Sequence, residues 1–225
     1  MTPHFMPFWA LLTRDLRLSV REGGGAALAL GFFALVATLV PLGIGPDLIL
    51  LAKVGGGVLW VGAVLAALLS LDRLFQADYE DGSLDLITLS PLSLEGAAAA
   101  KIAAHWLSTG LPLTLLSPVL SVLFGLSGPA LLALTLSLAI GTPAVSAVGA
   151  IGASLTLSLR RGGLILPLIV LPLLVPAVIF GAGMVVAVQT GLANGAIGLL
   201  AAFSLAATLL SPFVAAMAVR LNLAG

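Results

Sequence analysis

The strongest constraint in this sequence is the length of its uncharged stretches. No Asp, Glu, Lys or Arg occurs between residues 102 and 159, or between residues 162 and 219. Hydrophobic residues make up 60% of the chain and charged residues 8%, whereas soluble domains average about 25% charged residues. These features exclude a soluble globular fold. They predict an all-α membrane protein that crosses the bilayer several times.

Six membrane spans fit the pattern of charges. About 20 helical residues, each rising about 1.5 Å, cross a hydrocarbon core of about 30 Å. Each long uncharged stretch is therefore long enough for two crossings, with turns expected at 125–129 and 189–195. The predicted spans are about 26–44, 54–71, 102–124, 130–157, 164–187 and 196–219, which places residues 23–225 in one transmembrane domain.

The basic residues predict the orientation of these spans. With the N-terminus inside, eight of the nine Lys and Arg residues lie on the cytoplasmic side, and Lys53 is alone outside. Cytoplasmic loops of membrane proteins carry an excess of Lys and Arg. We therefore expect both termini to be cytoplasmic.

Residues 1–22 are too polar to cross the bilayer. Phe8, Trp9 and Leu12 recur at helical spacing, and Arg14 and Asp15 begin a charged group after them. This pattern is typical of an interfacial helix on the cytoplasmic leaflet. A positively charged flank without a regular helix is the alternative.

The connection between the second and third spans, residues 72–95, is the most polar part of the chain. It holds six of the nine acids: Asp72, Asp78, Glu80, Asp81, Asp85 and Glu95. The pattern predicts two short helices, with Gly82 ending the first and Ser83 capping the second. Because apolar residues are interleaved with the acids, we interpret this connection as a docking surface for a soluble partner. A solvated linker is the alternative, although such linkers usually lack this apolar content.

Several kinds of chemistry are not expected. The G-x-x-x-x-G-K-[ST] motif is missing, so ATP would be bound by a partner subunit and not by this chain. The chain has no cysteine, and its two histidines, His4 and His105, are far apart, so we predict neither a metal site nor catalytic residues. Basic and acidic residues balance, which argues against a nucleic-acid partner. No acid or base lies in the middle of a span, which argues against a carrier driven by protons or sodium.

A few residues within the spans remain as candidates. His105 and Trp106 are expected near the cytoplasmic interface, where a histidine could ligate a haem iron. A polar contact of His105 with a neighbouring helix, with Trp106 at the level of the headgroups, is the alternative that we favour. Pro112, Pro172 and Pro176 each remove an intrahelical hydrogen bond and predict helix kinks.

Three segments of the sequence resemble one family. They are FQADYEDGSLDL at 75–86, AKIAAHWL at 100–107 and LPLLVPAVIFG at 171–181. The sequence is similar to the haem exporter protein B family, CcmB. The similarity extends to the order of these segments, the length of the chain and the number of spans. The resemblance implies a permease-like fold of the ABC-2 type.

This resemblance also implies a set of partners. It implies a subunit of an ATP-binding cassette complex in the bacterial inner membrane, with two copies of this chain per complex. The implied partners are a cytoplasmic CcmA-like ATPase, a CcmC-like haem-handling membrane protein, a small CcmD-like membrane helper and a CcmE-like periplasmic haem chaperone. On this basis the acidic connection is the element that couples to the ATPase. The coupling residues would be Asp72, Phe75, Gln76, Asp78, Tyr79, Glu80, Asp81, Gly82, Leu84 and Asp85.

The cargo stays open at this point. Haem is a possible cargo, and no tightly bound cofactor is expected. The subunit would either export haem or use ATP hydrolysis to release the haem-loaded chaperone. The lack of a tryptophan-rich loop and of an outside histidine favours release. A general ABC export permease for a lipid, a polysaccharide or a small hydrophobic compound is an alternative, and a scaffold that does not transport is another.

Overall fold

The computed structural model describes residues 5–21, 25–159, 162–192 and 195–224. This part of the chain is helical and contains no strand. Its elements are α1 Phe5–Arg21, α2 Gly25–Ile44, α3 Leu48–Leu71, α4 Arg73–Glu80, α5 Ser83–Thr88, α6 Leu94–His105, the π-helical turn η1 Trp106–Gly110, α7 Leu111–Ser121, the 3-10 turn η2 Val122–Phe124, α8 Gly128–Leu155, α9 Gly162–Thr190 and α10 Ala196–Ala224. Six helical segments are long and apolar enough to cross a membrane. The predicted all-α fold with six spans is confirmed.

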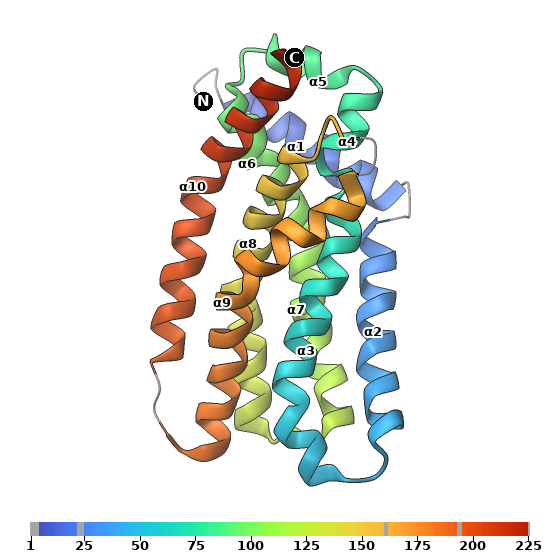
Figure 1. The fold of residues 1–225 in the computed structure, drawn as a ribbon, viewed down its shortest axis with the longest axis vertical. Coiled ribbons are helices and arrows are strands. Elements are labelled where there is room, and N and C mark those ends of the chain that lie inside the picture. Colours follow the sequence, from blue (N-terminus) through green and yellow to red (C-terminus); the bar gives the residue numbers. More distant parts are fainter. Residues whose placement is uncertain (1–4, 22–24, 160–161, 193–194, 225) are drawn as a thin grey trace.

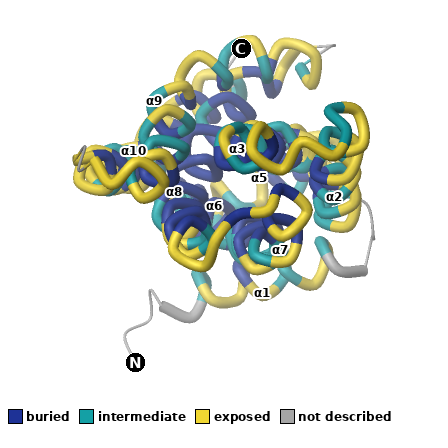
Figure 2. The backbone as a smooth tube through the Cα atoms, turned by 90° about the horizontal axis from the view of Figure 1, so that it is seen from below, coloured by how far each residue is buried: buried dark blue, intermediate teal, exposed yellow. Residues whose placement is uncertain are grey.

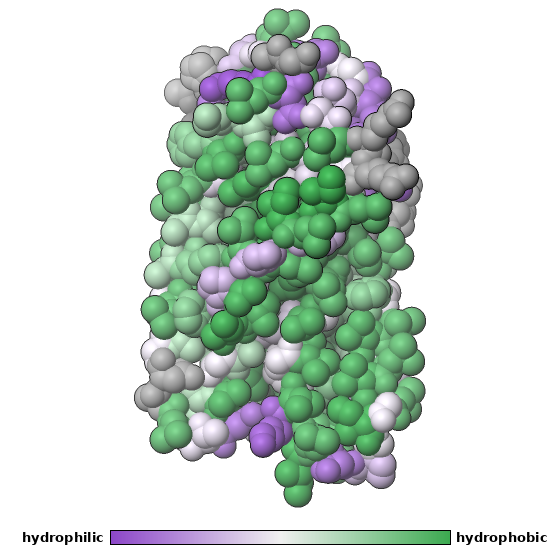
Figure 3. All heavy atoms as spheres, in the orientation of Figure 1, coloured by the Kyte–Doolittle hydropathy of each residue, from purple (hydrophilic) through white to green (hydrophobic). Residues whose placement is uncertain are grey.

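The six spans run side by side in an elongated bundle (Figure 1). The elements α1, α4 and α5 and the end of α10 lie together at one end, which we call the charged end. Hydrophilic residues gather mainly at the two ends of the bundle, and hydrophobic residues cover most of the surface between them (Figure 3). The described chain therefore starts and finishes at the same end, as an even number of crossings requires.

The helices α3 and α8 form the centre of the bundle. In the most apolar stretch of each of these spans, 61% of the residues are buried. In the corresponding stretches of α2 and α10, 17% of the residues are buried. Viewed along the bundle, buried residues concentrate toward the middle and exposed residues toward the periphery (Figure 2). The apolar outer faces of α2 and α10 suit contact with lipid.

Two helices begin well before the predicted start of their spans, because capping residues lie outside the apolar stretches. The α3 helix begins at Leu48 and not near residue 54, because the Asp47 carboxylate accepts hydrogen bonds from the amides of Ile49 and Leu50 at 3.1 and 2.9 Å. Likewise, α6 begins at Leu94 and not near residue 102. The Ser93 hydroxyl accepts a hydrogen bond from the amide of Gly96 at 3.1 Å. Lys101 therefore lies inside a helix and not at its boundary.

The third span is interrupted by the π-helical turn η1. Pro112 lies just after this turn and cannot donate a hydrogen bond to the carbonyl of residue 108, so a wider turn relieves its clash with the preceding helix. Pro172 and Pro176 lie within α9, whose ribbon runs obliquely at first and then parallel to its neighbours (Figure 1). Pro112 thus adjoins a departure from regular α-helix, and the prolines of α9 lie in a helix that changes direction along its length.

The centre of the bundle is packed around the indole of Trp60, which is fully buried on α3. Its Nε1 donates a hydrogen bond to the Ser137 hydroxyl on α8 at 2.8 Å. A Cβ atom added at Gly141 on α8 or at Gly181 on α9 would overlap the indole ring. Glycine at these two positions allows three spans to approach around one large side chain.

We predict that Gly181→Ala destabilises the protein, because the added methyl group overpacks the site against Trp60 by about 1–3 kcal/mol. Gly57→Ala is the matched control, since a Cβ there meets nothing within 4 Å. Thermal unfolding of both variants in detergent measures the difference. Equal melting temperatures for the two variants would contradict the packing described here.

Candidate functional site

The acidic connection folds into a compact helical hairpin, the α4–α5 segment, residues 73–88. Gly82 has a φ of 76° and ends α4 as predicted. Ser83 does not cap the next helix as predicted, because Gly82 takes the cap position and Ser83 is the first helical residue. The amide of Ser83 donates to an Asp81 carboxylate oxygen at 2.8 Å. Together with the contact of the Ser83 side chain, this bond lowers the pKa of Asp81.

One side of the α4–α5 segment is buried against the bundle. The apolar side chains of Phe75 and Leu84 are each 1% exposed, and Asp78 lies between them in the sequence with a side chain that is 5% exposed. Three of the predicted coupling residues therefore face inward. Asp78 is not available on the surface for a partner, so its predicted role as a direct docking contact is not supported by this geometry.

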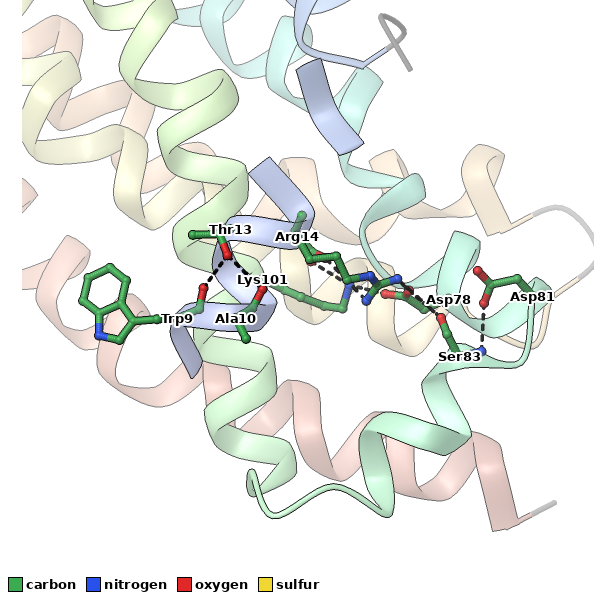
Figure 4. A network of polar contacts seen from close by, with 9 residues as sticks. Trp9, Ala10, Thr13, Arg14, Asp78, Asp81, Ser83 and Lys101 are labelled. Atoms are coloured by element: carbon green, nitrogen blue, oxygen red, sulfur yellow. Dashed lines mark hydrogen bonds and ion pairs between the residues drawn. The ribbon is translucent and has the colours of Figure 1, made fainter. Parts of the chain in front are cut away.

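The carboxylate of Asp78 is held by three other side chains (Figure 4). One of its oxygens contacts the Arg14 guanidinium and accepts a hydrogen bond from the Ser83 hydroxyl at 2.7 Å. Its other oxygen contacts the Lys101 ammonium, which also pairs with Asp15 at 2.9 Å. We call Arg14, Asp15, Asp78 and Lys101 the charge cluster. It joins α1, α4 and α6.

Most of the charge cluster was not anticipated from the sequence. Arg14 and Asp15 were assigned to the polar side of an interfacial helix, and Lys101 to a cytoplasmic flank. Their partners lie 64 and 86 residues away in the chain, so no local pattern identifies them. A partial signal was present, because Asp78 shares a helical face with Leu71 and Phe75, which are both buried.

The other side of the α4–α5 segment is exposed. It combines acids with apolar side chains, and Leu86 and Leu89 are 69% and 83% exposed. We call this surface, extended by Leu89 directly after the segment, the outer face; it consists of Tyr79, Glu80, Asp81, Asp85, Leu86 and Leu89. Exposed leucines beside acids form a surface that a protein partner can bury.

A groove of about 480 Å³ lies beside the outer face, between α4 and the start of α9. Asp72, Gln76 and Glu80 line it from one side and Gly162 and Gly163 from the other. The Gln76 amide donates to the Glu80 carboxylate at 2.8 Å. Two more of the predicted coupling residues, Asp72 and Gln76, thus border this groove and are not part of the outer face.

His105 is the last residue of α6, and it is 4% exposed. Its Nε2 is 2.9 Å from the Ser70 hydroxyl on α3, and its Nδ1 is 2.9 Å from the Ser146 hydroxyl on α8. The Trp106 indole donates to the Thr142 hydroxyl at 3.1 Å. Iron could bind His105 only after one of these hydrogen bonds breaks. The geometry therefore favours the polar contact between helices over a haem ligand.

Comparison with known proteins fits this architecture. The model of the CcmB protein family matches residues 6–222. Heme exporter protein B of Paracoccus denitrificans is 56% identical over 218 residues, which cover 95% of this chain and 99% of that protein. The chain belongs to the CcmB family.

Other CcmB family members are similar over nearly their whole length. Heme exporter protein B of Rhodobacter capsulatus is 52% identical, covering 95% of this chain and 99% of that protein. The Escherichia coli K12 protein of the same name is 41% identical, covering 97% of this chain and 100% of that protein. The matched region includes the charge cluster and, except for Phe5 and Leu223, α1 and all six spans. This CcmB family chain is a multi-pass membrane protein.

We predict that His105→Ala lowers stability by about 1–3 kcal/mol, because the buried hydroxyl of Ser146 loses its partner on the ring and the half-buried hydroxyl of Ser70 loses one of its contacts. Adding Ser70→Ala and Ser146→Ala to this variant should cost less than the sum of the single changes. Thermal unfolding in detergent measures these differences, with Ser108→Ala as the control because its hydroxyl bonds only within its own helix. Strictly additive effects would show that the ring does not connect α3 and α8.

Proposed function

We propose that this chain is the transmembrane subunit of an ATP-binding cassette complex for cytochrome c maturation. In this complex the α4–α5 segment docks into a partner ATPase, and the bundle couples ATP hydrolysis to haem export or to release of the haem-loaded periplasmic chaperone. The relatives of this chain that are named heme exporter protein B support haem export. The outer face carries the proposal, because it combines exposed leucines and acids on a segment that is packed against the bundle.

The charge distribution supports a cytoplasmic position for this segment. Arg14, Arg73 and Arg220 lie at the charged end, whereas Lys53 lies in α3 near the opposite end. By the positive-inside rule the charged end faces the cytoplasm, where ATP and a soluble ATPase are found. Both termini are then cytoplasmic, and the membrane is the bacterial inner membrane.

The packing of the bundle supports a role in energy transduction. The space enclosed by Trp60, Leu113 and Leu138 in the centre of the bundle is too small to hold a water molecule. A large cargo such as haem would therefore pass between two copies of this chain or be handled by a partner. We favour the second, in which ATP hydrolysis drives release of the loaded chaperone with the help of the CcmC-like and CcmD-like proteins.

We predict that Leu86→Asp weakens binding of the ATPase by about 30-fold, which corresponds to loss of an apolar anchor of about 2 kcal/mol. Glu80→Lys combined with Asp85→Lys should weaken it as well, through reversed charge. Lys53→Glu at the opposite end is the control. The measurement is co-purification of the ATPase from membranes, normalised to the amount of inserted subunit. Undiminished co-purification of both outer-face variants would contradict docking at this surface.

Deletion of the gene in a host that makes c-type cytochromes tests the cellular role. We expect holocytochromes, detected by haem staining, to disappear while the haem-loaded chaperone still forms. An empty chaperone would instead assign this subunit to haem supply, and normal holocytochromes would favour a general export permease. Holocytochromes that persist with a hydrolysis-deficient ATPase would favour a scaffold that does not transduce energy.

A further inference from the structure

We propose that Arg14 and Lys101 are positioning residues that link the α4–α5 segment, through Asp78, to α1 and to the third span. A displacement of the outer face would then move α1 and α6 together with the segment. This inference rests on the proposed function, because it assigns to the charge cluster the step between docking of the ATPase and movement of the bundle.

The geometry places the cluster where such a link is needed. Asp78 is on the inner side of the segment whose outer face is exposed, and it contacts Arg14 of α1 and Lys101 of α6 at the same time. Lys101 in turn pairs with Asp15 of α1 at 2.9 Å, so α1 is tied to both other elements. The two cations and two carboxylates cancel in charge, which allows all four to sit in a mostly buried site.

The ion pairs contribute more to the position of the α4–α5 segment than to the stability of the fold. Phe75 and Leu84 already attach the segment through apolar contacts, and buried ion pairs usually add little stability over apolar residues of similar size. Ion pairs do, however, impose one arrangement, because a shifted register leaves charges buried without partners. We infer that the cluster fixes the position of the segment relative to α1 and α6 more than it stabilises the fold.

The cluster borders free space, which allows movement. A cavity of about 360 Å³ at the charged end is lined by Arg14, Asp15 and Lys101, together with Ser70 and His105. One buried carboxylate oxygen of Asp15 has no hydrogen-bond partner among the described residues, and a guanidinium nitrogen of Arg14 lies 3.6 Å from it. Because both residues belong to α1, this contact can tighten by rotation of the two side chains alone.

A continuous set of contacts leads from the cluster into the bundle. Lys101 is one helical turn before His105 on α6, and His105 contacts Ser70 of α3 and Ser146 of α8. The π-helical turn follows immediately, and such turns occur frequently at functional sites. Displacement of Lys101 would thus reach the two central helices through a single side chain.

The first test measures coupling separately from docking in the complete complex. In Arg14→Gln and Lys101→Met we expect the ATPase to co-purify at normal levels, while holocytochrome formation falls by about tenfold, within the range of coupling effects found for residues between sites. Arg14→Lys and Lys101→Arg keep the charges and should restore part of the activity. Arg17→Gln is the matched control, because Arg17 is exposed on the same helix and makes no ion pair with the described residues.

The outcomes separate this inference from the proposed function. Normal holocytochrome formation in Arg14→Gln and Lys101→Met would overturn the inference and leave docking at the outer face intact. Loss of the ATPase in these variants would also overturn it, because the cluster would then only shape the docking surface. The proposal that the ATPase docks at the outer face is contradicted only if the outer-face variants still co-purify with the ATPase.

The second test reports the position of the segment without the ATPase. The chain has no cysteine, so a single introduced thiol is unique. Leu84→Cys, at a site that is 1% exposed, should react with a water-soluble maleimide about tenfold faster when combined with Arg14→Gln than when combined with Arg17→Gln, because removing one partner of a buried ion pair loosens the segment. Thr88→Cys, at an exposed site, should react equally in both backgrounds. Equal protection of Leu84→Cys in both backgrounds would overturn the inference.

Discussion

The hydrocarbon core of a bilayer offers no hydrogen-bond partner, and this constraint determines how polar groups are placed throughout the chain. The backbone satisfies itself in helices. Hydroxyl groups inside the spans donate mainly to carbonyls three or four residues earlier, as Thr114 and Ser117 do. Charged residues are displaced to the ends of the bundle, and most of them gather at one end. Any interaction with a soluble partner is therefore concentrated at that end, where the α4–α5 segment lies.

The fold could be predicted from the sequence because the pattern of charged and uncharged stretches extends over the whole chain. Uncharged stretches of the right length fix the number of spans, and this reasoning does not depend on which helices are neighbours. The start of α3 was not predicted, because Asp47 caps this helix from outside the apolar stretch. The π-helical turn before Pro112 was missed as well, since a proline predicts a disturbance and not its form.

The candidate site could be predicted only in part. Its location and its two short helices followed from the acids and from Gly82. The ion pairs that hold Asp78 in a buried position did not, because they depend on Arg14 and Lys101, which are remote in the chain. The same remoteness concealed the contacts of His105 with Ser70 and Ser146.

The π-helical turn has a consequence for how the third span presents its side chains. A turn of this kind is equivalent to one extra residue in an α-helix, and one residue corresponds to a rotation of about 100°. The faces of α6 and α7 are therefore out of phase, although both belong to one membrane crossing. The half toward the charged end directs Lys101 and His105 to their partners, while the other half packs by a separate alignment. The third span is thus two structural units in series, and the sequence of each can diverge without changing which face the other shows to the bundle.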